Sequence, residues 1–517
     1  MGSEMSLIDN LGDAIERNAK NLPDEIFISC DGRDVTFASF AARVRQLGSA
    51  CYRGGARKQD RVAILAMNGS EYVEAYGLAE VCGFILVLVN FRLAGPEVEW
   101  ILNDSQPSVL IFESGYADLV DELRTRCKTI TQFICIGKEK PPWAVDYESY
   151  VASGDPAGPP FRATANDFVS IIYTSGTTGR PKGVLCRHKQ PISLGLTQAI
   201  EHGSAIGTAA LIIMPLFHQG ARSIYLAQML RGGRLVIHRS FDPEAALASI
   251  QNDKIAISAL VPSMLQLMLE LHTFDRYDLS TLQSVISFGS AMPVPLLRRA
   301  ISAFGPVFSN GYGQTEGGNT VLRRQYLVLE GNEEALKRVG SVGQPLMHTE
   351  MRIIGDDGEE LPPCGHGEIC LRGDQVMDGY WNNHAATLDA IRDGWLHTGD
   401  IGYIGKDNFL YVVDRMKDMI ISGGENIYSP EVESALISHP EVQEASVIGL
   451  PDEKWGETVC AIVVRRPGSS FSGADLIAFA RSMIASYKCP KTVIFVDELP
   501  HVPTGKVDKV ALRHLHR

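Results

Sequence analysis

The sequence predicts an α/β protein with a large N-terminal domain of mixed α/β subdomains and parallel-rich sheets. A hinge joins this domain to a small C-terminal α+β domain. Strand-like and helix-like segments alternate as far as Phe308, which is typical of parallel sheets covered by helices. The chain has 517 residues, more than one hydrophobic core usually holds. From residue 429 the order changes to helix, strand, strand, helix, strand, which predicts a second compact unit.

The alternation begins near the N-terminus. Residues 10–18 carry apolar side chains on one face and end before Pro23, as an amphipathic helix does. Residues 61–67 are predicted to form a strand, and residues 72–81 the helix that follows it. The apolar run 81–89 is too short to cross a bilayer and predicts a buried strand.

The small domain is predicted to begin with a helix whose N-cap is Ser429 and whose first residue is Pro430. The elements after it are strands at 445–450 and 458–464, a helix at 474–485 and a strand at 492–496. A charged stretch, 414–418, precedes this unit and suits a linker. We therefore predict an N-terminal domain at 1–413, a hinge at 414–418 and a C-terminal domain at 419–517.

Composition excludes some classes of protein. With 45% hydrophobic and 21% charged residues, the chain resembles a soluble globular protein. The net charge is −13 and no long basic run occurs, which argues against a nucleic-acid partner. The ten cysteines form no C-x-x-C pair, so reduced thiols in a cytoplasmic protein are expected. We find neither the apolar core of a signal peptide nor a transmembrane segment.

The most informative segment is the loop Thr174-Ser-Gly-Thr-Thr-Gly-Arg-Pro-Lys-Gly183, which follows a predicted strand at 168–173. Its hydroxyls, backbone N–H groups and lysine suit a polyphosphate, although such clusters also occur in plain surface turns. It is not a Walker A loop, because Pro181 precedes the lysine and Gly183 follows it. The candidate phosphate-binding residues are Thr174, Ser175, Gly176, Thr177, Thr178, Gly179 and Lys182.

A second candidate segment, residues 310–316, ends a predicted strand with an aromatic ring, a hydroxyl and a carboxylate. Tyr312 could stack on a purine, and Thr315 could bind a phosphate. Glu316 could hold Mg²⁺, which prefers carboxylate and phosphate oxygens. The same residues also fit a common turn.

Two further candidates lie toward the C-terminus. Asp400 could accept hydrogen bonds from ribose hydroxyls, and Arg415 could bind the same ribose. The alternative for this pair is a structural ion pair. Lys506 lies on a predicted turn at 503–508, where a lysine by itself is usually a solvated surface charge.

Taken together, these motifs resemble the adenylate-forming superfamily of acyl-CoA synthetases, amino-acid adenylation domains and firefly-type luciferases. The resemblance covers residues 7–512 and implies ATP, Mg²⁺ and coenzyme A as cofactors. It makes Lys506 the catalytic lysine, Glu316 the Mg²⁺ ligand and Thr315 a contact of the α-phosphate. Lys417 would be the hinge residue, and Gly423 and Gly424 would line the thiol tunnel. The resemblance adds these nucleotide-binding residues: Gly289, Ser290, Ala291, Asn310, Gly311, Tyr312, Gly313, Gln314, Asp400 and Arg415.

The reaction implied by the resemblance has two steps. A carboxylate first attacks the α-phosphorus of ATP, which releases pyrophosphate and gives an acyl-adenylate. A thiol then attacks the activated carbonyl and AMP leaves. The small domain would swing about the hinge between the two steps, so that Lys506 acts only in the first.

The acid and the acceptor are less specified. His218 and Gln219 stand where amino-acid adenylation domains carry an Asp, so a plain carboxylic acid is expected. His218 matches the aromatic gate of acyl-CoA synthetases, with a core histidine as the alternative. Small residues at 220–221 and 317–319 suggest room for a medium-chain, ring-bearing or aromatic acid.

Free coenzyme A is the expected acceptor, because no carrier domain follows Lys506. A separate carrier protein stays open as an alternative, as does a non-catalytic nucleotide-binding or acyl-adenylate-binding protein on the same fold. A homodimer is compatible with the sequence. The partners expected are thus a small carboxylic acid and coenzyme A.

Overall fold

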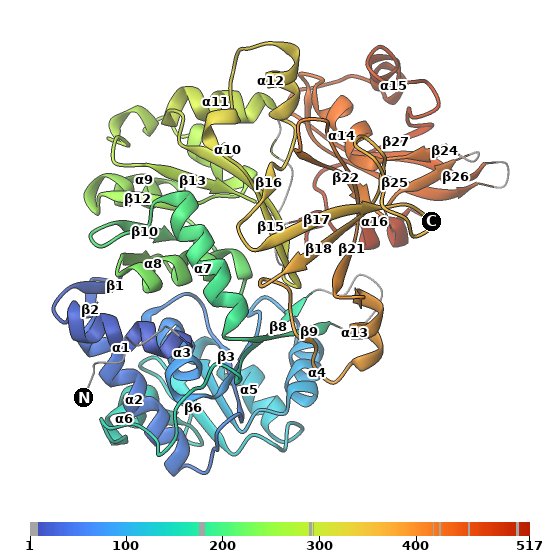
Figure 1. Ribbon diagram of the computed structural model, residues 1–517. Coiled ribbons are helices and arrows are strands. Elements are labelled where there is room, and N and C mark those ends of the chain that lie inside the picture. The colour runs from blue at the N-terminus through green and yellow to red at the C-terminus, as the bar shows by residue number, and fades with distance from the viewer. Residues whose placement is uncertain are drawn as a thin grey trace. The chain divides into compact units, whose positions relative to one another are not determined.

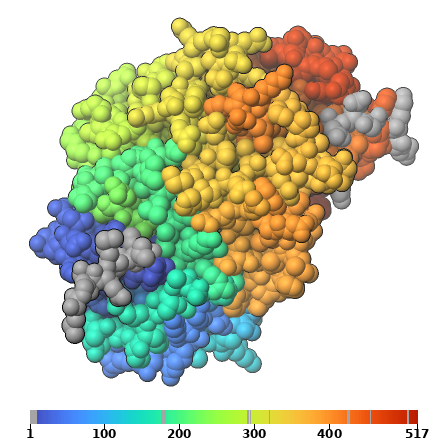
Figure 2. Space-filling model, in the orientation of Figure 1, coloured from blue at the N-terminus to red at the C-terminus, as the bar shows by residue number. Residues whose placement is uncertain are grey.

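The computed structural model forms two compact units. It describes residues 9–174, 181–288, 292, 294–416, 418–422, 425–452, 455–502 and 506–516. The first unit comprises residues up to 339 with 345–350 and 371–396, and the second comprises 340–344, 351–370 and 397–517. In Figures 1 and 2 the blue, green and yellow segments belong mainly to the first unit and the red segment to the second.

Two mostly parallel sheets organise the first unit, as the alternation predicts. One runs in the order β16-β15-β14-β13-β12-β10-β11-β1-β2, in which the strands from β14 to β1 are parallel and β15 and β2 pair with them in antiparallel fashion. The other runs β19-β9-β8-β4-β3-β5-β6-β7, with antiparallel pairing only at β9 and β19. The α/β class with parallel-rich sheets is therefore confirmed.

The strands of the first sheet are β1 (Ile26–Cys30), β2 (Arg33–Thr36), β10 (Ala209–Ile212), β11 (Arg234–Ile237), β12 (Ile255–Ala259), β13 (Ser284–Ser287), β14 (Phe308–Gln314) and β15 (Gly317–Leu322). Those of the second are β3 (Arg61–Leu65), β4 (Ile85–Leu88), β5 (Val109–Glu113), β6 (Gln132–Ile136), β7 (Val145–Asp146), β8 (Phe168–Thr174), β9 (Lys182–Arg187) and β19 (Gly379–Tyr380).

The helices labelled in Figure 1 connect these strands. Those of the first unit are α1 (Leu11–Asn21), α2 (Phe37–Arg53), α3 (Ser70–Cys82), α4 (Gly95–Ser105), α5 (Ala117–Arg124), α6 (Tyr147–Ser153), α7 (Lys189–His202), α8 (Gln219–Arg231), α9 (Pro243–Asn252), α10 (Pro262–Leu269), α11 (Val294–Phe304), α12 (Glu333–Arg338) and α13 (His384–Ala390). Among described residues, no helix is long and apolar enough to span a membrane.

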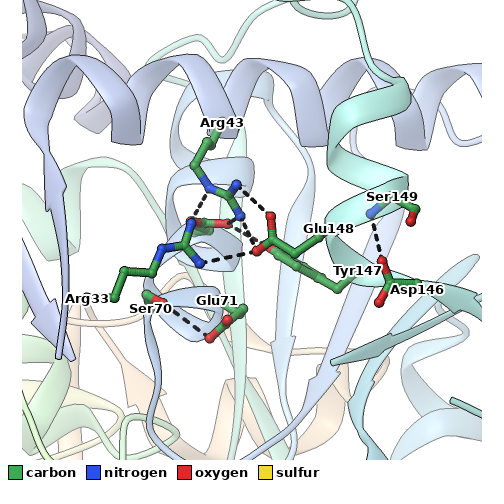
Figure 3. A network of polar contacts seen from close by, with 9 residues as sticks. Arg33, Arg43, Ser70, Glu71, Asp146, Tyr147, Glu148 and Ser149 are labelled. Atoms are coloured by element: carbon green, nitrogen blue, oxygen red, sulfur yellow. Dashed lines mark hydrogen bonds and ion pairs between the residues drawn. The ribbon is translucent and has the colours of Figure 1, made fainter. Parts of the chain in front are cut away.

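An ion-pair network, buried at Glu74 and exposed at Glu148, connects three of these helices (Figure 3). Arg43 of α2 donates hydrogen bonds to Glu74 of α3 at 2.7 Å and to Glu148 of α6 at 2.8 Å. The Tyr147 hydroxyl donates to the second oxygen of Glu74 at 2.8 Å. Burial raises the pKa of Glu74, against the opposing effect of Arg43. Removing Arg43 would leave the buried Glu74 carboxylate without its ion-pair partner, which is costly.

The second unit contains the predicted α+β elements and more. Its C-terminal sheet has the order β24-β23-β26-β25, with β27 beside β26. The bounds are β22 (Leu410–Arg415), β23 (Ile420–Ser422), β24 (Glu425–Ile427), α14 (Ser429–Ile437), β25 (Val442–Asp452), β26 (Gly456–Arg465), α15 (Gly473–Arg481), β27 (Thr492–Val496) and α16 (Lys509–Leu515). The sequence analysis missed β23, β24 and α16, which are short.

The remaining strands lie in the first unit or contain residues of both units. Strand β20 (Ile391–Arg392) belongs to the first unit. The strands with residues of both units are β16 (Gln344–Pro345), β17 (Thr349–Ile354), β18 (Gly367–Gly373) and β21 (Trp395–Ile404). The predicted hinge, 414–418, stays a prediction.

Two local predictions were wrong. The apolar run 81–89 is not one strand, because α3 continues to Cys82 and Gly83 ends it in the left-handed region at φ +77°. Ser429 is the first residue of α14 and Tyr428 its N-cap. The Ser429 side chain instead donates a hydrogen bond to Asp414 at 3.0 Å, so it is used outside the helix. The ten cysteines, all within described residues, are free thiols, and of these Cys364 is exposed.

Candidate active site

The predicted phosphate loop connects β8 to β9. These strands pair in antiparallel register, with Thr174 opposite Lys182, and the Thr174 hydroxyl donates to the Lys182 carbonyl at 3.4 Å. The two ends of the loop are therefore fixed by the hairpin. The residues between them, Ser175, Gly176, Thr177, Thr178 and Gly179, lie outside the described residues.

The predicted adenine-binding segment lies where β13 ends. Ser287 of β13 pairs with Asn310 of β14, so the chain leaves β13 beside the start of the segment 310–316. Gly289, Ser290 and Ala291 lie outside the described residues. The predicted residues of β14 are Asn310, Gly311, Tyr312, Gly313 and Gln314, of which Gly313 is exposed and the others half-buried.

Thr315 and Glu316 form the tight turn from β14 into β15. Both are half-buried, and the Glu316 carbonyl accepts a hydrogen bond from the Met377 N–H at 2.8 Å. Gly317 and Gly318 follow with φ of +122° and +71°, which favour glycine. The turn therefore requires its glycines for backbone reasons and is held by the segment around residue 377.

Tyr380 connects the phosphate loop to this turn. The Lys182 ammonium lies over the Tyr380 ring, 4.3 Å from its centroid. The Tyr380 hydroxyl donates a hydrogen bond to Glu316 Oε1 at 2.8 Å. Burial, and then the Glu316 carboxylate, raise the pKa of Tyr380, so the phenol stays a donor. The sequence analysis missed Tyr380, and a two-residue strand gives no periodic signal that would have found it.

The Glu316 carboxylate fits a divalent cation. Oε1 accepts the Tyr380 hydrogen bond, and within the described residues no donor lies on Oε2. One carboxylate oxygen is thus held while the other is available as a ligand, the arrangement expected of a Mg²⁺ site that takes its remaining ligands from phosphates and water.

His218 begins helix α8 and is not a core histidine. It is half-buried, and its Nδ1 accepts the N–H of Gly220 at 3.1 Å, so the ring caps the helix. The role of His218 as an acyl gate stays a prediction.

At three of the small residues, Gly220, Gly317 and Gly318, neighbouring residues fill the space beside the glycine, which contradicts the open volume expected there. A Cβ on Gly220 would lie 2.0 Å from the Phe288 ring. Added Cβ atoms on Gly317 and Gly318 would lie 2.3 Å from the Gln375 carbonyl oxygen and 2.4 Å from Leu371. These glycines permit close packing by neighbouring segments.

In the second unit, Asp400 and Arg415 face each other across β21 and β22. They are register partners, with Arg415 Nε 3.1 Å from Asp400 Oδ1. The Asp400 side chain is 5% exposed and that of Arg415 43%. The Asp400 N–H donates to the Thr398 hydroxyl at 3.1 Å. The structural ion pair therefore exists, and the role of both residues at the ribose stays a prediction.

A cluster that the sequence analysis missed holds the chain just before Asp400. Glu368 Oε1 accepts the Gly399 N–H at 3.0 Å, and Oε2 lies 2.7 Å from His397 Nδ1. The Cys370 sulfur is 3.4 Å from the same nitrogen. Thiol, imidazole and carboxylate are donor types that zinc accepts, but here the carboxylate and imidazole pair with each other and with the backbone. The cluster fixes the segment 397–399.

Lys506 is exposed, and the backbone on both sides of it is hydrogen-bonded. The Val502 N–H donates to the Lys506 carbonyl and the Asp508 N–H to the Pro500 carbonyl, both at 2.8 Å. Asp508 is the N-cap of α16, so Lys506 lies shortly before this helix. The remaining predicted residues of this unit, Lys417, Gly423 and Gly424, lie outside the described residues.

Two conserved-domain models match this chain: the AMP-binding enzyme model over residues 15–381 and the AMP-binding enzyme C-terminal domain model over 431–506. The chain belongs to the AMP-binding enzyme family, and its predicted place in the adenylate-forming superfamily is confirmed.

Relatives place it on the acid–CoA ligase branch. It is 36% identical to a feruloyl-CoA synthase of Amycolatopsis over 97% of this chain and 98% of the relative. It is 34% identical to an indoleacetate–CoA ligase of Aromatoleum aromaticum over 98% of each. Its structure resembles that of the o-succinylbenzoate CoA synthetase of Bacillus subtilis in complex with an acyl-adenylate, with a TM-score of 0.85, 29% identity and 98% of each chain covered.

Proposed function

We propose that this enzyme is an ATP-dependent, AMP-forming acid–CoA ligase that makes an acyl-adenylate and transfers the acyl group to coenzyme A. The observation that carries the proposal is the contact chain from Lys182 through Tyr380 to Glu316. Lys182 of the phosphate loop and Glu316, the predicted metal ligand, both contact Tyr380, although they come from segments of different sheets. If the phosphate loop were only a surface turn, these contacts would not be expected.

The first half-reaction is largely a problem of charge, because a carboxylate must approach a polyanion. Lys182 and the hydroxyl of Thr174 are suited to the phosphates, and Thr315 to the α-phosphate. Mg²⁺ held by Glu316 would neutralise phosphate charge and polarise the P–O bonds. Lys506 would stabilise the charge that develops on the α-phosphate oxygens.

Binding of the nucleoside is assigned to other residues. Tyr312 would stack on the adenine, and Asp400 with Arg415 would hold the ribose. A buried aspartate whose backbone N–H is already bonded needs little reorganisation to accept two hydroxyl donors. In the second half-reaction the thiol attacks the acyl carbonyl, and AMP leaves as a phosphate anion.

We propose a ring-bearing or aromatic acid as the substrate, with a medium-chain acid as the second candidate. The support is that the relatives named above act on ferulate, indoleacetate and succinylbenzoate. His218 is the first position to test in the acyl pocket.

A panel of carboxylic acids tests both parts of the proposal. Pyrophosphate release is measured with each acid, with and without coenzyme A, and the products are separated. The expected products are AMP, pyrophosphate and a thioester. ADP, or adenylate that only a carrier protein accepts, would overturn the assignment. Nucleotide binding without turnover on any acid would instead favour a non-catalytic binding protein.

His218→Ala refines the acid assignment in the same assay. It should change the acid preference, or KM for the acid, much more than KM for ATP. Cytoplasmic location and a homodimeric state stay predictions, the latter tested by analytical ultracentrifugation.

A further inference from the structure

Tyr380 is fixed by its backbone before its side chain makes any contact. It pairs with Val184 in the β19–β9 ladder, and its N–H donates to the Thr387 hydroxyl at 2.8 Å. Gly379 precedes it at φ +145°, and a Cβ there would lie 2.7 Å from Thr387. The tyrosine is 8% exposed. The backbone of Tyr380 is therefore fixed, and its side chain is buried.

The two ends of the side chain do different things. The ring face receives the Lys182 ammonium at 4.3 Å, within cation–π distance. The hydroxyl donates to one oxygen of Glu316 at 2.8 Å. A substitution can remove the second contact while keeping the first, because phenylalanine has the same ring without the hydroxyl.

We propose that Tyr380 is the positioning residue of the metal-binding carboxylate: its hydroxyl orients Glu316 so that Oε2 faces the cation that accompanies ATP. This inference rests on the proposed role of Glu316 in holding Mg²⁺. Partners that orient a metal ligand usually affect metal affinity about 10–100-fold. A tyrosine that only packs β19 against β9 would affect stability and leave metal affinity unchanged.

The test measures metal binding without catalysis. Mn²⁺ is titrated into the whole enzyme with ATP and no acid, and free Mn²⁺ is followed by electron paramagnetic resonance. Tyr380→Phe should weaken Mn²⁺ binding in the ATP complex by about 10-fold. ATP binding without metal should stay unchanged, because the ring contact to Lys182 remains. Raising the metal concentration should restore kcat.

Tyr147→Phe is the matched control. It removes a tyrosine–carboxylate hydrogen bond of the same length, 2.8 Å to Glu74, from a buried tyrosine in the network of Figure 3. It should leave Mn²⁺ affinity unchanged. An equal loss of metal affinity in Tyr147→Phe and Tyr380→Phe would overturn the inference, because the effect would then be a general one of structure.

Glu316→Gln separates this inference from the proposed function. If Glu316→Gln weakens Mn²⁺ binding but Tyr380→Phe does not, Tyr380 is not the positioning residue and the role of Glu316 stands. If Glu316→Gln binds Mn²⁺ as tightly as the parent enzyme, the proposed metal site itself is wrong, and the inference falls with it. Weakening in both variants, with Tyr147→Phe unchanged, supports the inference.

Discussion

Glu316 and Asp400, the two carboxylates assigned to ATP, are held in different ways. Glu316 is half-buried on a turn of the first unit, and its side chain is fixed by the hydroxyl of Tyr380. Asp400 is 3% exposed within a strand of the second unit, and its position follows from the β21–β22 register and the bond from its own N–H to Thr398. One is positioned by a side chain from elsewhere in the chain, the other by local backbone.

The difference suits the two ligands proposed for them. Ribose hydroxyls are neutral and directional, so a preformed acceptor in a strand is sufficient. A metal ion binds together with ATP and requires a carboxylate with one oxygen available as a ligand. A hydrogen bond to the second carboxylate oxygen keeps the group oriented. The comparison predicts that the affinity for ATP depends on Asp400 with or without metal. It should depend on Glu316 only when metal is present.

The largest effect is expected at Lys506, which tests whether the second unit contributes to chemistry as well as to binding. Lys506→Ala should slow acyl-adenylate formation by about 10²–10³, the usual effect of losing one charge-stabilising donor. With pre-formed acyl-adenylate and coenzyme A, the same variant should make thioester at a near-normal rate. Each half-reaction is measured separately by quenched flow, and equal losses in both would contradict two distinct poses.

A buried histidine gives the first unit a pH response of its own. His202 is buried, its Nδ1 lies 2.9 Å from the Ser284 hydroxyl, and burial lowers its pKa to about 4 from 6.5. Above pH 6.5 the ring is neutral in both folded and unfolded chains. As the pH falls from 6.5 to 4, only the unfolded chain takes up the proton, so folding stability falls by about 3 kcal/mol.

His202→Gln should remove that response. The free energy of unfolding is measured in urea between pH 7.5 and 4.5 for both proteins. The wild type should be the more stable at pH 7.5, and its advantage should shrink as the pH falls. Two parallel curves would show that His202 does not titrate as its burial implies.

Asp400→Asn tests the preformed acceptor. It keeps the shape of the side chain but removes the charge, and charged hydrogen bonds contribute about 1.5–3 kcal/mol. KM for ATP should rise about 10–100-fold at every Mg²⁺ concentration, with kcat less affected. Little stability should be lost, because the partner Arg415 is 43% exposed. A Mg²⁺-dependent effect would remove the distinction between the two carboxylates.

The same contrast explains what could be predicted from the sequence. The α/β alternation and the strand at 492–496 follow from local patterns, and the structure has β27 at those residues. Asp400 and Arg415 are fifteen residues apart on adjacent strands, so two residues predicted to bind the same ribose are also in contact. Tyr380 meets Lys182 and Glu316 only through tertiary packing, and Gly220 meets Phe288 in the same way. Such contacts leave no periodicity in the chain, which is why these residues were missed or misinterpreted.

The smallest effect compares two glycines beside the two carboxylates. Gly317 and Gly399 both have positive φ, at +122° and +68°. A Cβ at Gly317 would lie 2.3 Å from a backbone oxygen, whereas one at Gly399 would meet nothing within 4 Å. Gly399→Ala should therefore cost only the conformational strain, about 1 kcal/mol, and Gly317→Ala about 2–3 kcal/mol because the backbone must also shift. The free energies of unfolding of both variants in urea give the difference, and equal costs would mean that the turn at Glu316 is no more tightly packed than the strand at Asp400.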